Sequence, residues 1–473
     1  MKDNLHIVSR NLSRKEAQSI RNDAGGYLFW YDSRYIIQDL EHKTYQSRIS
    51  NETKKRINYD IIDRILKLSD IKIEGISLSS FLSIEKMNFW FYQRLNLYMF
   101  WRNAEYLLEE LRCAPDDLNI ILYSYLPDGC FEDPVFKNVD IRFAKAIGRN
   151  LNSKKWKIAA SMFFALLKGI YFRPDSLISD KHLLIDNARP VSLFDPVNKK
   201  TITGNYVLGN VFKLLDTRFT IIQERGLPGK RIATKSQFRN SFQYSKLSID
   251  FFSADIIIAK AILKSRIRKK YREVRNNLAG RIEQVKNKLS TDKYSILRYY
   301  LSVNLQSNNI YILRYLGFRD LIKSKNPLSV SASDENSPFT KCLLDAASSL
   351  GIKTTGIQHG AIHELHPAYR FTAAEIKSGI LPDKTLVWGN KWKNILTNIS
   401  NYPANSVIIT GQARTDSVNE LISLEDNAQR SSGIILFASQ PQRDPLMRAR
   451  AANALFLVRM INMKEMRDSA IRV

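Results

Sequence analysis

The chain has 473 residues, 44% of them hydrophobic, which predicts two or three domains with a sizeable core. Its formal net charge of +26 indicates an anionic partner, such as nucleic acid, an acidic membrane face, or phosphorylated or acidic sugars. The cysteines, Cys113, Cys130 and Cys342, fit neither a zinc site nor a disulfide framework and favour a reducing compartment. No run of about 18 apolar residues occurs, so we predict no transmembrane helix.

Residues 1–70 are polar, basic and helix-prone, and we expect a helical N-terminal region in which Ser13 caps the first helix. The aromatic residues 27–31 fit a short strand or a helix edge. Residues 71–78 alternate like a strand, whereas the aromatic-rich run 81–111 has the spacing of a helix that faces the core. A further strand is predicted at residues 119–124.

The middle of the chain alternates between helical and irregular patterns. We predict a helix at 144–171, a strand at 181–186, loops at 187–205 and 226–243, and a helix pair at 294–323. Residues 251–289 read as one long helix with a basic centre at 264–275. This centre is either a solvated face or a contact with an anionic membrane or polyanionic glycan. No nucleic-acid-binding module is present in the sequence, so we expect no specific nucleic-acid partner.

Residues 328–440 alternate strand, polar tip and helix, which is typical of a parallel α/β sheet. The predicted strands are 328–333, 353–357, 385–389, 406–411 and 433–439. Because ligands bind outside the carboxyl ends of such strands, the polar tips are the candidate site.

The loop after the strand at 353–357 holds the strongest candidate, His359, which can act as general base on a sugar hydroxyl. Glu335 or Asp334, at the end of the preceding strand, would orient it or act as base instead; the alternative is a histidine that only holds the turn. Other candidate substrate-binding residues of this loop are Gln358, Gly360, His363, His366 and Tyr369. The spacing of the three histidines is a weak metal pattern, and we predict no metal.

The turn from Gly411 to Asp416 resembles the start of a helix whose backbone amides meet a phosphate, with Arg414 supplying charge. No Walker A sequence and no Gly-x-Gly-x-x-Gly occurs, so ATP or dinucleotide binding has no support.

Taken together, Asp-Glu near a strand end, Gly-Ile-Gln-His-Gly, a downstream Tyr, Leu-Val-Trp-Gly-x-x-Trp, Ile-Ile-Thr-Gly-x-x-Arg-x-Asp and Ile-Leu-Phe-Ala-Ser-Gln-Pro resemble surface and capsular polysaccharide glycosyltransferases. The resemblance covers residues 329–441 and implies a GT-B architecture of two Rossmann-type domains. It implies that the Gln-His-Gly loop faces the cleft. It also implies that Thr-Gly-x-x-Arg-x-Asp closes the first domain and that Ser-Gln-Pro opens the second domain, which holds the donor nucleotide. The candidate donor-binding residues are Gly411, Arg414, Asp416, Ser439 and Gln440.

The expected fold is therefore α/β and GT-B-like, with a parallel Rossmann-type sheet and a large helical N-terminal portion. We expect an acceptor-side domain at 71–430 with helical insertions at about 140–325, followed at 431–473 by the start of an incomplete, truncated donor domain. A donor domain needs roughly 100 residues or more, so we expect this chain alone to bind donor poorly.

The expected function is transfer of a sugar from a nucleotide sugar to a glycan or lipid-linked acceptor in cell-surface polysaccharide biosynthesis. No cofactor other than the nucleotide-sugar donor is expected. The expected location is the cytoplasm, at the inner face of the cell membrane. Two alternatives stay open: a polyol-phosphate or Kdo-type transferase, and a non-catalytic remnant or scaffold subunit of a polysaccharide assembly complex.

Overall fold

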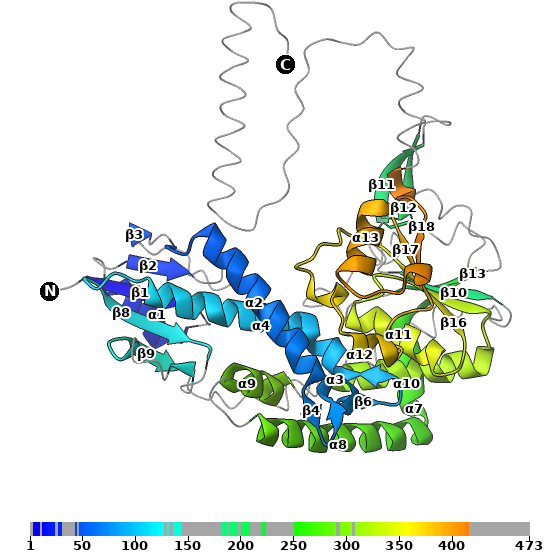
Figure 1. Cartoon of the computed structure of the whole chain (residues 1–473), viewed down its shortest axis with the longest axis horizontal. Coiled ribbons are helices and arrows are strands. Elements are labelled where there is room, and N and C mark those ends of the chain that lie inside the picture. Colours follow the sequence, from blue (N-terminus) through cyan, green and yellow to red (C-terminus); the bar gives the residue numbers. More distant parts are fainter. Residues whose placement is uncertain are drawn as a thin grey trace, which may run out of the picture.

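The computed structural model contains two parallel β-sheets that lie side by side along the long axis of the molecule, with helices packed between and around them (Figure 1). The described residues are 3–9, 12–23, 27–30, 43–44, 47–126, 130–131, 136–143, 181–186, 190–195, 200–205, 207–208, 219–223, 250–289, 294–304 and 308–415.

The first sheet has five parallel strands in the order β3-β2-β1-β8-β9. Their bounds are β1 Asn4–Val8, β2 Tyr27–Trp30, β3 Lys43–Thr44, β8 Asn119–Ser124 and β9 Asp140–Phe143. Counted along the chain, this order is 3-2-1-4-5, which is the strand order of a Rossmann-type sheet.

The prediction of a helical region over residues 1–70 is wrong because this region also contains strands β1, β2 and β3. Helices α1 (Arg14–Arg21) and α2 (Asn51–Asp70) are present, and Ser13 caps α1 in a capping box as expected. The short run that forms β1 nevertheless becomes a central strand, in which Leu5 and Ile7 are fully buried. Its partners are β2 and the distant β8, so tertiary pairing rather than local pattern decides its conformation.

The second sheet has seven parallel strands in the order β14-β13-β10-β15-β16-β17-β18. Their bounds are β10 His182–Asp186, β13 Phe219–Gln223, β14 Asp250–Ser253, β15 Ser329–Ser333, β16 Lys353–Ile357, β17 Lys384–Val387 and β18 Val407–Ile409. Their order along the chain, 3-2-1-4-5-6-7, again begins as a Rossmann-type sheet.

This topology corrects the expected single sheet over residues 71–430. Strand β8 belongs to the first sheet, whereas β10 and all later parallel strands belong to the second. A second Rossmann-order sheet therefore already lies before residue 431, where the sequence placed the beginning of the second domain. Residues 431–473 themselves lie outside the described residues, as do the expected helix at 144–171 and the loop at 226–243.

Three local predictions are also corrected. The expected strand at 71–78 is a hairpin of β4 (Lys72–Ile73) and β5 (Ile76–Ser77), because Glu74 and Gly75 adopt positive φ and turn the chain. The expected loop at 187–205 contains an antiparallel pair, β11 (Pro190–Asp195) and β12 (Lys200–Asn205). The expected long helix at 251–289 is β14 followed by α7 (Ala254–Leu263) and α8 (Ser265–Lys288).

The helix predicted at 81–111 begins only at residue 89, because residues 83–88 form a hairpin in which Glu85 adopts positive φ and turns the chain. Before α4 (Phe89–Arg112) come α3 (Leu78–Phe81) and the hairpin β6 (Ser83–Ile84) and β7 (Met87–Asn88). The predicted helix pair at 294–323 is confirmed as α9 (Ser295–Asn304) and α10 (Asn308–Lys325). The second sheet also carries α11 (Pro338–Ser348), η8 (Pro367–Tyr369), α12 (Ala373–Lys377), α13 (Asn390–Asn398), η9 (Ala404–Ser406) and η10 (Ala413–Thr415).

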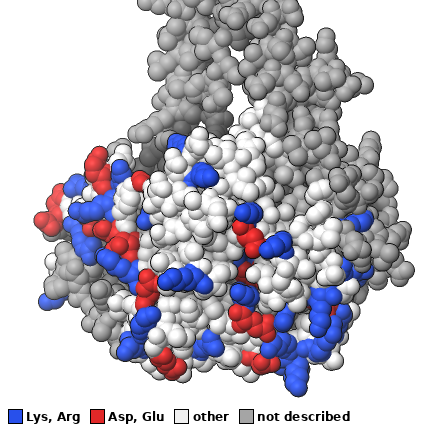
Figure 2. Space-filling view, turned by 45° about the vertical axis from the view of Figure 1, so that its right-hand side comes forward, with Lys and Arg blue, Asp and Glu red and all other residues white. Residues whose placement is uncertain are grey.

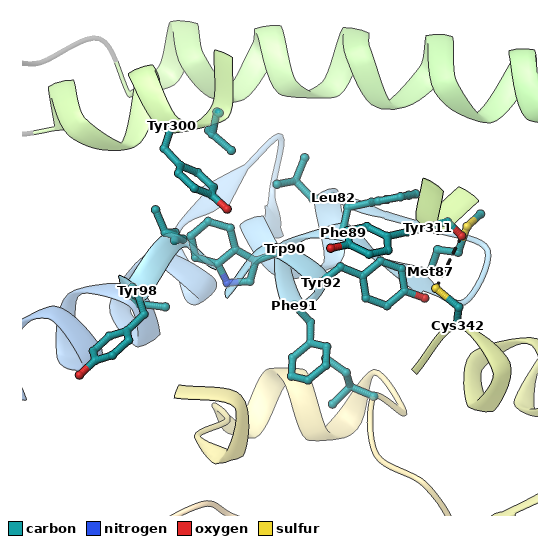
Figure 3. Packing of buried hydrophobic residues seen from close by; sticks show 14 of the residues in the cluster. Leu82, Met87, Phe89, Trp90, Phe91, Tyr92, Tyr98, Tyr300, Tyr311 and Cys342 are labelled. Atoms are coloured by element: carbon teal, nitrogen blue, oxygen red, sulfur yellow. Dashed lines mark hydrogen bonds between the residues drawn. The ribbon is translucent and has the colours of Figure 1, made fainter. Parts of the chain in front are cut away.

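Helix α4 joins the two halves of the core, and its aromatic residues are buried as predicted (Figure 3). The Trp90 indole donates a hydrogen bond to Ser69 Oγ (2.7 Å) on α2. The Tyr92 hydroxyl donates to Asp345 Oδ2 (2.6 Å) on α11. The helix thus ties the first half to the second by hydrogen bonds inside an apolar core.

Among the described helices, α4 included, none has the combined length and apolar composition needed to cross a bilayer.

Candidate active site

The candidate site lies at the carboxyl ends of the neighbouring strands β15, β16 and β17. In the second sheet the chain order reverses between β10 and β15, since β13 lies on one side of β10 and β15 on the other. Such a switch point is where open parallel sheets bind ligands, because the loops leave in opposite directions and open a crevice. The predicted polar tips after β15 and β16 are therefore brought together beside this point.

Asp334 follows β15 directly and has a left-handed conformation, with φ of 67°. Its N–H donates to the Ile357 carbonyl (3.3 Å) of β16, and its own carbonyl accepts from the Ser337 N–H (3.1 Å). These bonds hold a backbone conformation that non-glycine residues rarely adopt and that is common at functional sites. The resulting sharp turn directs the Asp334 side chain toward the end of β16.

The Asp334 carboxylate meets His359, whose Nδ1 lies 3.5 Å from Asp334 Oδ1. Both side chains are partly exposed, 26% for His359 and 22% for Asp334. A carboxylate beside Nδ1 favours the tautomer with the proton on that atom, which leaves Nε2 as the basic nitrogen. The distance is long for a hydrogen bond, as is common for catalytic pairs without substrate. The pairing of a strand-end carboxylate with His359 therefore agrees with the sequence-based expectation, and the partner is Asp334.

Gln358 was predicted to bind substrate, but the structure gives it a position in the interior. Its side chain is fully buried, and both ends of its amide are used: Nε2 donates to the Gly360 carbonyl (2.8 Å), and Oε1 accepts from the Trp388 N–H (2.9 Å). Gln358 therefore ties the His359 turn to the end of β17 instead of contacting a substrate. A side chain on Gly360 would meet open space, so the turn leaves room above it.

The other predicted residues of the histidine loop, His363, His366 and Tyr369, differ in how far they are buried. His363 is exposed, whereas Tyr369 is buried and its hydroxyl lies beside the Asn336 side chain. Burial, together with the neighbouring His363 and His359, lowers the pKa of His366 to about 4, so His366 is neutral at pH 7. Direct substrate contact, predicted for all three, fits only His363 in this structure. No group of three or more metal-binding side chains occurs within the described ranges.

Glu335, the alternative base, is fully buried behind the exposed pair. Neither carboxylate oxygen has a hydrogen-bond partner among the described residues. Burial, with a smaller contribution from Asp334, raises the pKa of Glu335 to about 8. Asp334, and not Glu335, is therefore the carboxylate that lies beside His359 and contacts solvent.

The raised pKa makes the stability of the protein depend on pH. The folded carboxyl keeps its proton up to about pH 8, whereas the unfolded one ionises near its ordinary value of 4.5. The contribution of Glu335 to stability therefore falls as pH rises from 4.5 to 8, by about 1.4 kcal/mol per pH unit, whereas the lowered pKa of His366 acts in the opposite direction below about pH 6.5. We expect Glu335→Gln to remove this slope from the thermal midpoints measured across that window. Glu283→Gln, at a glutamate 60% exposed, is the control and should keep the slope; an equal slope in both variants would contradict the assignment.

Gly356 of β16 makes room for the Glu335 side chain. A Cβ at this position would lie 2.7 Å from Glu335 Cγ and 2.8 Å from its Cβ. Because both partners are buried, the clash cannot relax into solvent, and we expect Gly356→Ala to destabilise the protein by about 1–3 kcal/mol. Gly280→Ala is the matched control, since nothing lies within 4 Å of its added Cβ in α8. Chemical denaturation should show Gly280→Ala as neutral or stabilising by about 0.5–1 kcal/mol; destabilisation by both would implicate something other than the contact with Glu335.

The predicted donor residues are only partly described. Gly411 follows the edge strand β18, is exposed, and has φ of 80°. The side chain of Arg414 and the whole of Asp416, Ser439 and Gln440 lie outside the described residues. Gly411 and His359 thus both lie at the carboxyl ends of their strands, β18 and β16, and β17 lies between these two strands.

Two features beside the site were given no role from the sequence. Trp388 follows β17 directly, next to the Gln358 amide, and meets Trp392 edge-to-face, with ring centroids 5.4 Å apart. Both rings are partly exposed, and the Trp-Gly-x-x-Trp spacing was the available signal. The second feature is a contact of the histidine loop with α2: the Tyr59 hydroxyl bonds Glu364, and Thr372 Oγ1 donates to Asp70 Oδ1 (2.8 Å). The loop therefore faces the first half of the molecule.

No family model, curated protein or solved structure matches this chain. Its class rests on the coordinates: an α/β protein with two parallel sheets of Rossmann strand order. Its candidate site is a histidine–carboxylate pair at the carboxyl ends of two adjacent strands of the second sheet.

Proposed function

We propose that this protein is a glycosyltransferase that transfers a sugar from a nucleotide sugar to a hydroxyl of a glycan or lipid-linked acceptor in cell-surface polysaccharide biosynthesis. The observation that carries the proposal is the His359–Asp334 pair. In the transfer step His359 Nε2 takes the proton of the acceptor hydroxyl. The oxygen of that hydroxyl forms a bond to the anomeric carbon of the donor sugar. The bond from that carbon to the nucleotide breaks, and the nucleotide leaves with the electron pair.

Asp334 supports this step electrostatically. As the proton arrives, the imidazole becomes an imidazolium, and the carboxylate at 3.5 Å from Nδ1 stabilises the new charge. Partial exposure of both groups gives an acceptor access to them. Glu335 has no role in proton transfer in this scheme.

The GT-B arrangement is part of the proposal. Two Rossmann-order sheets in one chain support it. The histidine loop, which belongs to the second half of the chain, contacts α2 of the first half and supports it too. In such an arrangement donor and acceptor meet between the two halves. The net charge of +26 suits a phosphorylated donor.

The test is transfer from a panel of nucleotide sugars carrying UDP, GDP, CDP or CMP, with release of the free nucleotide as readout. Calorimetric titration with the same nucleotides measures binding separately. Release that depends on an added acceptor and on one nucleotide class supports the proposal and names the donor, including a polyol-phosphate or Kdo-type donor. Absence of both release and binding across the panel would overturn the proposal in favour of a non-catalytic subunit.

A further inference from the structure

The outer face of α8 forms a basic ridge, defined here as the cations of residues 264–275. This range holds seven basic residues and one acidic residue. The inner face of the helix is apolar and packs on the core through Ile267, Val274, Leu278, Ile282 and Val285. Helix α8 lies along the lower edge of the molecule in Figure 1, and Figure 2 shows basic side chains grouped at the lower right of the same edge.

Some cations of the ridge have structural partners. Lys264 and Arg266 pair with Asp320 of α10, and Lys270 pairs with Glu85 and Glu273. Arg268 donates to the carbonyls of Ile262 and Leu263, at 2.9 and 2.7 Å, at the end of α7. These residues hold the corner between α7 and α8 in place.

Three other cations, Lys269, Arg272 and Arg275, are exposed and make no ion pair with any described residue. Spaced three residues apart, they cover about 120° of the helix circumference, and all three are exposed. Their charges are therefore unopposed on one surface of a rigid helix. Such a surface attracts a flat anionic partner.

An apolar side chain accompanies these charges. Leu263, at the corner before Lys264, is 62% exposed, the largest exposure among the large hydrophobic residues of the described chain. A leucine flanked by cations gains by entering the headgroup region of a bilayer, whereas a nucleic acid or soluble glycan offers it little. Tyr271, the ring on the ridge, is covered by Arg275 at 5.9 Å, which leaves no open platform for stacking a base.

We propose that the basic ridge docks the protein on an anionic lipid bilayer, with Leu263 entering the headgroup region. Helix α8 packs on α10, which precedes β15 and Asp334 in the chain, so docking would also fix the orientation of the candidate site relative to the membrane. The docking does not depend on the transfer activity, and its test leaves that activity aside.

The test is sedimentation of the full chain with vesicles of phosphatidylcholine alone or mixed with phosphatidylglycerol. The wild type should bind only the anionic vesicles, with an affinity that falls as salt rises. Reversing the three unpaired charges in Lys269→Glu/Arg272→Glu/Arg275→Glu should lower that affinity about 100-fold or more, since each cation near an anionic surface contributes roughly fivefold.

The matched control is Lys353→Glu/Lys377→Glu/Lys391→Glu, which makes the same charge change at exposed positions away from the ridge. It should weaken vesicle binding only a few-fold, and circular dichroism should show both variants folded. An equal loss in the two variants would mean that net charge alone drives binding and would overturn the proposal.

Leu263→Ser separates a bilayer from other polyanions. It should weaken vesicle binding several-fold and leave retention on heparin or duplex DNA unchanged. Unchanged vesicle binding by this variant, or equal wild-type binding to neutral vesicles, would contradict docking by this surface. Loss of DNA binding in the ridge variant with vesicle binding intact would assign the ridge to nucleic acid instead.

Discussion

His359→Ala is expected to lower the rate of sugar transfer by about 10²–10⁴-fold, the usual contribution of a positioned general base. The imidazole is partly exposed at the end of β16 and beside the Asp334 carboxylate, so its removal takes away the basic nitrogen without opening the core. The thermal midpoint should therefore change little. The measurement is the initial rate of nucleotide release with saturating acceptor.

Two variants make this result specific. Asp334→Asn keeps a side chain that tolerates the φ of 67° but removes the charge, so we expect a smaller loss than for His359→Ala. His182→Ala is the matched control. His182 begins β10 and so lies at the amino ends of the strands, away from the candidate site, where its Nδ1 lies 2.7 Å from Ser329 Oγ. It should retain wild-type activity. A His359→Ala protein as active as this control would remove His359 from the mechanism.

Arg94→Ala is expected to destabilise the folded protein by about 3–5 kcal/mol, the usual cost of breaking a buried ion pair. Arg94 of α4 and Glu375 of α12 form an ion pair in which the side chains are 1% and 0% exposed. Arg94 also donates to the Arg370 carbonyl and to Ser69 Oγ (3.3 Å). Its removal leaves a carboxylate in the core without its cation. Calorimetry should record a large fall in the thermal midpoint.

The control for Arg94→Ala is a surface pair of the same type. Lys67 lies 2.6 Å from Asp63 on α2, with side chains 75% and 58% exposed. Lys67→Ala should cost less than about 1 kcal/mol, because water screens and solvates both partners. The double variant Arg94→Met/Glu375→Leu should recover much of the lost stability, since no buried charge remains unpaired. It keeps part of the loss, because Glu375 also accepts from the Thr372 N–H (3.0 Å).

Local sequence patterns alone predict several strands and the approach of two strand-end residues in the candidate site. Strands β8, β10, β15, β16 and β17 lie where apolar runs end in polar tips, because burial of a parallel strand requires a local apolar run bounded by turns. The approach of His359 to the end of β15 also followed from the sequence. Parallel strands that are neighbours in a sheet present their carboxyl ends at one edge, so residues that end them become neighbours.

Tertiary packing, in contrast, sets how the strands divide into two sheets and which polar residues point inward. Leu5 of β1 pairs with Ile120 of β8, a contact between distant segments that no local pattern encodes. Glu335 and Asp334 are adjacent in sequence, yet Glu335 is buried against Gly356 while Asp334 stays partly exposed beside His359. The left-handed turn at Asp334 and the packing around Gly356 set these directions, and both depend on residues brought together by folding.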